Sequence, residues 1–187
     1  MTLTASNMLP LGTPAPPFAL PDPVNGGEKC LDELKSDKAT VVMFICNHCP
    51  YVKHIREELV SVSREYIGRG ISFVAINAND ATNYPDDSPA RMKEVVEEFG
   101  YPFPYLYDES QVIARAYKAA CTPDIYVFDR DLKLVYRGQF DDSRPGSGIP
   151  VTGKDLRGAL DRILRGEPVS PDQKPSMGCN IKWYEKP

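Results

Sequence analysis

A Cys-x-x-Cys motif between a strand and a helix constrains this chain more than any other feature. Residues 41–45 form a short apolar run rich in β-branched side chains, typical of a central strand covered on both faces. The run ends at Cys46, and Cys49 follows three residues later. Apolar residues then recur at spacings of three and four as far as Ile67, which predicts a helix with one buried face. A second buried strand is predicted over residues 71–77, so the motif lies on the turn of a parallel β-α-β unit.

The segments that follow predict a mixed sheet with further helices. Ser88 followed by Pro89 predicts the beginning of a helix, which Gly100 closes. Residues 125–128 and 132–140 read as two strands joined by a three-residue turn, which is the pattern of a hairpin. The sheet is therefore expected to be parallel at one end and antiparallel at the other.

Four more segments complete the predicted layout. A short helix is expected over residues 110–119, and Thr152 with Asp155 three residues later predicts a capping box for the last helix. The first 29 residues are rich in proline and glycine and predict an extended arm, and residues 167–187 form a proline-rich tail. The length of 187 residues fits one domain that includes both segments.

Composition limits the classes of partner. The formal net charge is −4 and the isoelectric point is near 5.3, which argues against nucleic acid or an anionic membrane as the main partner. The beginning of the chain has no secretory pattern, and no apolar run approaches the length of a membrane span, so we expect a cytoplasmic protein. Structural disulfides are rare in the cytoplasm, and with five cysteines at least one thiol is unpaired within the chain. The Cys-x-x-Cys pair is therefore expected to be catalytic or metal-binding.

The predicted turn suits redox chemistry. A helix that begins near Asn47 would place Cys46 at its N-terminus and Cys49 one turn in, on the same face. The helix dipole would then stabilise a Cys46 thiolate, and a protonated His48 would lower the pKa of that thiol further. Pro50 is tolerated because the first-turn N–H groups have no partner within the helix.

Several motifs together resemble the thioredoxin superfamily, and within it the redoxin, or AhpC/TSA, branch of peroxiredoxin-like bacterial proteins. They are GTPAPPFAL, CNHCPYV, YPDDSPARM, CTPDIYVFD and KPSMGCNIKW. The resemblance implies a thioredoxin-like α/β fold, with a mixed central sheet flanked by helices and an N-terminal redoxin extension. It also implies a redox-active disulfide, no cofactor, and a cis bond between Thr122 and Pro123 beside the cysteines. Three positions depart from the family: Ile45 replaces the Trp of thioredoxin, Thr40 replaces its buried acid, and Cys46 replaces the Thr or Ser of peroxiredoxins.

Three functions are open at this point. The first is thiol–disulfide exchange, in which Cys46 attacks, Cys49 resolves, and Thr122 and Pro123 face the substrate. The second is an antioxidant thiol peroxidase, in which Cys49 is oxidised to sulfenic acid and then resolved by Cys46 or Cys179. Both imply protein or small-molecule disulfides or peroxides as substrates, together with a thiol reductant system.

The third is a metal-binding module without catalysis. Cys46, His48, Cys49 and His54 are all metal-ligand types, but adjacent residues on a helix point in different directions, so we expect no metal site. Outside the motif, Cys179 is a candidate resolving thiol because apolar residues on either side can dock the tail. Cys121 is expected to serve packing.

Overall fold

The computed structural model describes residues 2–184, so Met1 and the last three residues of the predicted tail lie outside the described part. The strands are β1 (Leu3–Ala5), β2 (Ala19–Pro21), β3 (Glu28–Cys30), β4 (Ala39–Phe44), β5 (Ser72–Asn77), β6 (Tyr105–Tyr107), β7 (Cys121–Thr122), β8 (Asp124–Asp129), β9 (Leu134–Gly138) and β10 (Met177–Asn180). The helices are α1 (Leu31–Leu34), α2 (Pro50–Gly68), η1 (a 3₁₀ turn, Pro85–Asp87), α3 (Pro89–Phe99), α4 (Val112–Ala116) and α5 (Lys154–Leu164).

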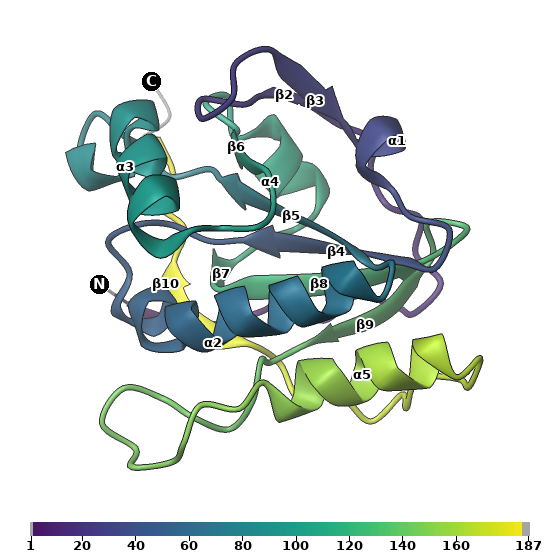
Figure 1. Cartoon of the computed structure of the whole chain (residues 1–187). Coiled ribbons are helices and arrows are strands. Elements are labelled where there is room, and N and C mark those ends of the chain that lie inside the picture. The colour runs from purple at the N-terminus through teal and green to yellow at the C-terminus, as the bar shows by residue number, and fades with distance from the viewer. Residues whose placement is uncertain (1, 185–187) are drawn as a thin grey trace.

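The main sheet is mixed, as predicted. Its strand order is β6-β5-β4-β8-β9, with β4, β5 and β6 parallel and with β8 and β9 antiparallel to their neighbours. Every side chain of β4 is buried, because both of its faces are covered. The β4-α2-β5 unit therefore lies at the centre of the fold, and the Cys-x-x-Cys segment leaves the sheet from its central strand (Figure 1).

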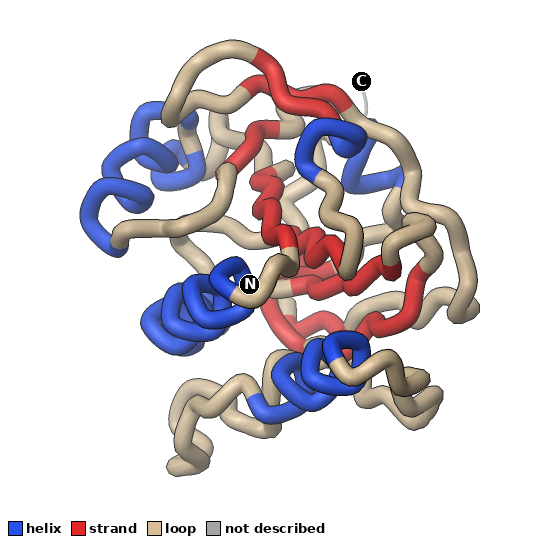
Figure 2. Tube along the Cα trace, turned by 45° about the vertical axis from the view of Figure 1, so that its right-hand side comes forward, coloured by secondary structure: helices blue, strands red, loops and turns tan. Residues whose placement is uncertain are grey.

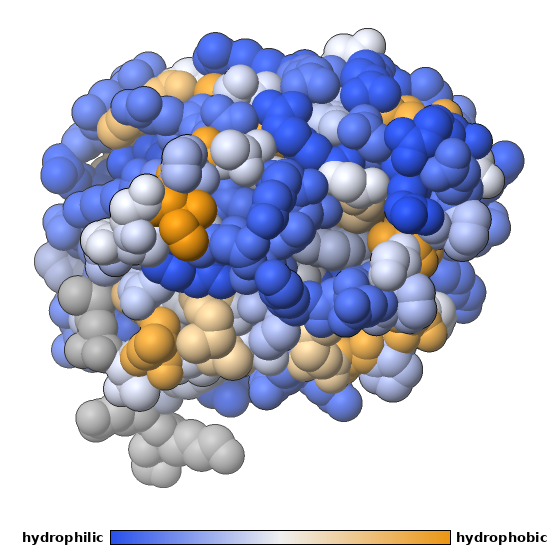
Figure 3. Space-filling view, turned by 90° about the horizontal axis from the view of Figure 1, so that it is seen from below, coloured by the Kyte–Doolittle hydropathy of each residue, from blue (hydrophilic) through white to orange (hydrophobic). Residues whose placement is uncertain are grey.

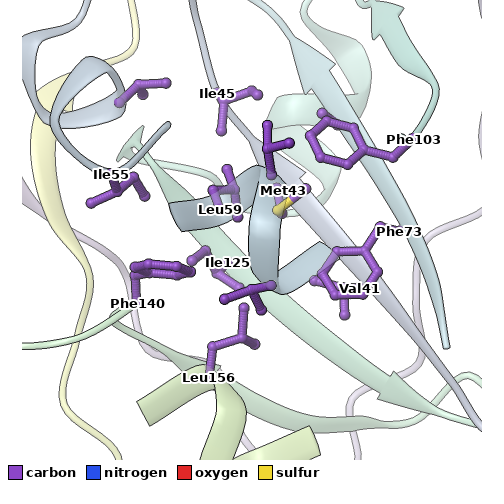
Figure 4. Close-up of a cluster of buried hydrophobic side chains, with 14 of the residues drawn as sticks. Val41, Met43, Ile45, Ile55, Leu59, Phe73, Phe103, Ile125, Phe140 and Leu156 are labelled. Carbon is purple, nitrogen blue, oxygen red and sulfur yellow. The ribbon is translucent and has the colours of Figure 1, made fainter. Parts of the chain in front are cut away.

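Alternate residues of β4 enter two separate cores. Val41 and Met43, with Ile45 directly after the strand, pack with α2 and α5 on one face, in the cluster that Figure 4 shows. Val42 and Phe44 pack on the other face with α4 and the N-terminal arm. This alternation is the period of two expected of a strand buried on both sides.

Helices α2 and α5 lie side by side on the first face of the sheet (Figures 1 and 2). Arg157 of α5 joins them through ion pairs to Glu58, at 3.0 Å, and to Glu65. These charges are partly exposed, so we expect each pair to add little to stability. The apolar residues beneath them hold the two helices to the sheet.

Two predicted helix boundaries are wrong. The capping box at Thr152 and Asp155 does not form: α5 begins after Gly153, whose φ of 63° is left-handed. The amides of Thr152 and Gly153 instead donate to the buried Asp141, both at 2.7 Å. Helix α4 is also shorter than predicted, because Gln111 adopts φ 61° and cannot extend the helix towards its N-terminus.

The tail forms a strand that the sequence pattern did not predict. Strand β10 lies between β1 and β7 in a three-stranded antiparallel sheet. In Figure 1 the yellow β10 runs past the beginning of α2. Strand β1, near the beginning of the described chain, and strand β10, near its end, are thus paired beside the Cys-x-x-Cys segment.

The surface has no extended apolar area on the side shown in Figure 3. Hydrophilic side chains cover most of that face, and hydrophobic ones form several separate areas. Among residues 2–184, no helix is long and apolar enough to cross a membrane.

Candidate active site

The helix that follows the Cys-x-x-Cys segment begins later than predicted. Its first residue is Pro50, so Cys49 is the N-cap and Cys46 lies three residues before that N-cap. The cause is local: a residue that precedes proline is excluded from helical backbone angles, and Cys49 has φ −64° and ψ 123°. The expectation of a helix from Asn47 was therefore wrong, and the N-terminal end of the dipole favours a thiolate at Cys49 rather than at Cys46.

Cys49 lies among hydrogen-bonding groups. Its Sγ is 2.9 Å from the Sγ of Cys179 and 3.2 Å from the carbonyl oxygen of Thr122. Hydrogen bonding from Cys46 is the largest influence and lowers the pKa of Cys49. Burial opposes this, but further hydrogen bonds, including those from Cys179 and the Val52 amide, bring the pKa to about 4. This pKa favours the thiolate form of Cys49 at neutral pH, and in that form the 3.2 Å contact with the Thr122 carbonyl oxygen, which can only accept, is not a hydrogen bond.

Cys46 has the opposite character. Its Sγ lies 3.3 Å from the Oγ1 of Thr122, and 1% of the residue is exposed. Burial raises the pKa of Cys46 well above its ordinary value, and the hydrogen bond with Cys49 raises it further. The pair therefore shares one negative charge, which lies on Cys49, and Cys46 keeps its proton.

Strand β10 brings Cys179 to this pair. Cys179 is directly opposite Thr122 in the ladder between β10 and β7, and the bond between Thr122 and Pro123 is cis, as the resemblance implied. Burial raises the pKa of Cys179 to about 12, with the Cys49 hydrogen bond as a further cause. A second thiol that keeps its proton therefore lies against the Cys49 sulfur.

The close approach of β10 depends on Gly178. A Cβ atom at this residue would lie 1.9 Å from the carbonyl oxygen of Thr122, which is backbone and cannot turn aside. We expect Gly178→Ala to displace β10 and to lower the free energy of unfolding by about 1–3 kcal/mol, a cost typical of overpacking. The alkylation of Cys179 should become faster in the reduced protein.

Gly158→Ala is the matched control for this substitution. Gly158 is in α5, and a Cβ there would meet nothing within 4 Å. Alanine is the better helix former, so the control should be neutral or stabilising by up to about 1 kcal/mol. Equal stability and equal Cys179 labelling in both variants would contradict the role given to Gly178.

The His48 ring contacts a buried carboxylate. Its Nδ1 is 2.6 Å from Oδ2 of Asp87, and its ring stacks on Tyr84 at 5.3 Å. Asp87 ends η1 and also accepts from the backbone amides of Asn47, at 2.7 Å, and His48, at 3.3 Å. The loop between the two cysteines is therefore held by Asp87, which the sequence analysis did not select.

The four candidate ligands of the metal-binding alternative, which are Cys46, His48, Cys49 and His54, do not form one close group. His54 contacts Ser143, with 2.7 Å between Nε2 and Oγ, on the side of α2 that faces the loop before α5. In the described part of the chain, the close group of metal-ligand types is instead Cys46, His48 and Asp87, whose side-chain atoms lie within 4.8 Å of one another.

Arg137 and Cys121 are two further buried residues. Arg137 is fully buried and pairs with Asp124 at 3.2 Å, so its charge is already compensated there. Cys121 is buried with its Sγ 3.5 Å from the carbonyl oxygen of Pro123, and burial raises its pKa. The Cys121 thiol lies close enough to Cys49 and Cys179 for their charges to raise its pKa further, whereas the Arg137 guanidinium is paired with Asp124.

Comparison with solved structures begins with a close relative. An uncharacterised conserved protein from Geobacillus kaustophilus is 62% identical, with a TM-score of 0.98, over 100% of this chain and 99% of the other. Two more distant structures share the fold. The thioredoxin domain of a thiol-disulfide oxidoreductase from Bacteroides vulgatus has 19% identity and a TM-score of 0.59, over 70% and 89% of the two chains. The peroxidoxin BcpB from Mycobacterium tuberculosis has 18% identity and a TM-score of 0.61, over 83% and 96%.

These distant neighbours identify the fold as thioredoxin-like, and they include both thiol-disulfide oxidoreductase and peroxiredoxin types. No curated protein matches the chain. The sequence itself matches the AhpC/TSA family over residues 11–137, from the N-terminal arm to the last strand of the main sheet. This protein therefore belongs to the AhpC/TSA family of thioredoxin-like redoxins.

Proposed function

We propose that the protein is a thiol–disulfide oxidoreductase whose redox pair is Cys46 and Cys49, with Cys49 as the attacking thiolate. The observation that carries this proposal is the position of Cys49 as N-cap of α2, with its pKa lowered to about 4. Cys46 keeps its proton in the resting state and resolves the intermediate. This order is the reverse of the one predicted from a helix beginning at Asn47.

The two steps of exchange follow from these protonation states. The Cys49 thiolate attacks one sulfur of a substrate disulfide, forming a mixed disulfide and releasing the other sulfur as a thiolate. Cys46 then loses its proton and attacks the Cys49 sulfur, which closes a Cys46–Cys49 disulfide and releases the second substrate thiol. Thr122 and Pro123 lie beside the pair and form the backbone that the substrate would meet.

Trapping the mixed disulfide tests this order. In Cys46→Ser, the Cys49 adduct of a small disulfide such as oxidised glutathione should persist, because the resolving thiol is absent. In Cys49→Ser, no adduct should form at neutral pH. Cys30→Ser is the control, since Cys30 is in β3 and packs with the N-terminal arm. A stable adduct on Cys46 in the Cys49→Ser protein would contradict the assignment.

A thiol peroxidase is the second candidate, and the burial of the sulfurs favours it. The exposed fractions are 0% for Cys49, 1% for Cys46 and 4% for Cys179, which suits a substrate as small as a peroxide. A peroxide would oxidise the Cys49 thiolate to sulfenic acid and leave as an alcohol or water. The Cys179 thiol, 2.9 Å away, would then form a disulfide with Cys49 and release water.

Disulfide mapping after one equivalent of hydrogen peroxide separates the two candidates. A peroxidase resolved by Cys179 gives a Cys49–Cys179 bond, and Cys179→Ser should then accumulate a sulfenic acid that dimedone traps. Turnover with a thiol reductant should accompany it. A Cys46–Cys49 bond with no peroxide turnover would leave only the exchange activity.

A further inference from the structure

We propose that His48, held in place by Asp87, accepts the proton that Cys46 must lose before it resolves the Cys49 mixed disulfide. This inference rests on the proposed exchange function and concerns its second step. His48 would be the proton acceptor and Asp87 a positioning residue. Neither role follows from the Cys-x-x-Cys motif itself.

The need for an acceptor comes from the Cys46 thiol. Cys46 is buried and protonated, so solvent can remove its proton only slowly, and attack by Cys46 requires the thiolate. In β4, Thr40 supplies no carboxylate; it is fully buried and its Oγ1 accepts from the Ser36 amide at 3.1 Å. The acceptor must therefore come from another element.

Asp87 reaches the site from η1 and is fully buried. Oδ2 accepts from Nδ1 of His48 at 2.6 Å and from Nδ2 of Asn79 at 2.7 Å, and Oδ1 accepts from the Asn47 and His48 amides. Burial alone would raise the pKa of Asp87, but the hydrogen bonds, led by the one from His48, lower it below its ordinary value. Asp87 is thus a fixed carboxylate that orients the imidazole.

This contact determines which ring nitrogen can take a proton. Because Nδ1 donates to a carboxylate, a neutral His48 has its lone pair on Nε2. Nε2 is buried and has no hydrogen-bond partner in the part of the chain that the structure describes. Side-chain atoms of His48 and Asp87 lie within 4.8 Å of the Cys46 sulfur. One nitrogen of the imidazole thus lies near a thiol that must ionise, and Nε2 of the same ring is a buried lone pair without a donor, so the ring fits a proton acceptor.

The other charged and titratable groups around the ring leave this role to His48. Tyr84 stacks on the imidazole, and the Lys182 ammonium lies 5.6 Å above the Tyr84 ring. Arg56 of α2 donates to the carbonyl oxygen of Asn47 at 3.1 Å and lies over Phe99 at 4.4 Å. Both cations stabilise the negative charge of this region, and neither can accept a proton at neutral pH.

The step balances as a proton transfer coupled to exchange. The thiol proton of Cys46 passes to His48, which becomes an imidazolium paired with Asp87. The Cys46 thiolate attacks the Cys49 sulfur, so the Cys46–Cys49 bond forms and the bond from Cys49 to the substrate sulfur breaks. The departing substrate thiolate takes the proton from His48, which returns to its neutral form.

Two-phase release of thiopyridone from 4,4′-dithiodipyridine tests the inference. The probe is added at half an equivalent to Cys179→Ser protein, so that Cys46 is the resolving thiol. The first release reports attack by Cys49, and the second reports resolution by Cys46. In His48→Gln the second phase should slow by roughly 10²-fold at neutral pH, as general base catalysis is typically worth 10²–10⁴. The first phase should keep its rate.

The pH profile distinguishes proton transfer from a structural effect. The second-phase rate should depend on pH less steeply with His48 than in His48→Gln, where it should rise about tenfold per pH unit because Cys46 must then ionise to solvent. Asp87→Asn keeps an oxygen that accepts from Nδ1 and should give a smaller loss in the same phase. His54→Gln is the control, since His54 contacts Ser143.

The outcomes separate this inference from the function on which it rests. An unchanged second phase in both His48→Gln and Asp87→Asn would overturn the proton-acceptor role alone. Equal slowing of both phases with an unaltered pH profile would also overturn it, because that result indicates a displaced loop. A wild-type protein in which no first release occurs at Cys49 would overturn the proposed exchange function and this inference together.

Discussion

Alkylation of Cys49 by iodoacetamide is expected to proceed at almost the same rate at pH 6 and at pH 8. The thiolate is the reacting form, and a pKa of about 4 leaves Cys49 ionised throughout this range. A thiol of ordinary pKa would react about a hundredfold faster at pH 8 than at pH 6, because its thiolate fraction rises tenfold per unit. Burial slows the reaction at every pH and leaves the shape of the profile unchanged.

Two variants at Cys46 test what lowers the pKa of Cys49. Cys46→Ser keeps a hydrogen-bond donor beside the Cys49 sulfur, whereas Cys46→Ala removes the largest influence that lowers its pKa. We therefore expect the thiolate absorbance of Cys49 to titrate at a higher pH in Cys46→Ala than in Cys46→Ser. A wild-type alkylation rate that climbs tenfold per pH unit from 6 to 8 would show that Cys49 is an ordinary thiol.

The part of the site that is local in sequence could be predicted, because its determinants are short-range. The apolar run before Cys46 and the helical spacing after Cys49 placed the pair on a β-α turn. The error in the helix beginning was avoidable, since Pro50 by itself excludes Cys49 from the helix. Because the helix begins at Pro50 and not at Asn47, the N-terminal end of its dipole acts on Cys49 instead of Cys46.

The partners of the pair could not be predicted from local pattern. Asp87 binds the Asn47 amide across 40 residues, and Cys179 meets Cys49 across 130. Both contacts depend on how η1 and β10 pack against the sheet, and no periodicity in either segment encodes that. One feature of the tail sequence indicates the contact of β10. Gly178, beside Cys179, lets β10 come close to the Thr122 backbone, which any side chain at this position would prevent.

Asp124→Ala is expected to lower the free energy of unfolding by about 3–5 kcal/mol at neutral pH, because it leaves a buried charge without its partner. The Asp124 and Arg137 side chains are both 0% exposed, and 3.2 Å separates Oδ2 from Nη2. Arg137 would keep only its bond to the Lys118 carbonyl, at 2.9 Å, and its place over the Tyr126 ring. Urea denaturation with an unchanged m-value measures the loss.

The double variant Asp124→Ala/Arg137→Met shows whether the charge is the cause. Burial is the largest influence on the pKa of Asp124 and raises it, whereas the Arg137 charge lowers it; the net effect is a raised pKa. The attraction between the two charges therefore does not fully offset the cost of removing the Asp124 carboxylate from water. Replacing both partners with apolar side chains should therefore recover much of the stability that Asp124→Ala loses. A double variant as unstable as the sum of the two single variants would show that packing, and not the uncompensated guanidinium, accounts for the loss.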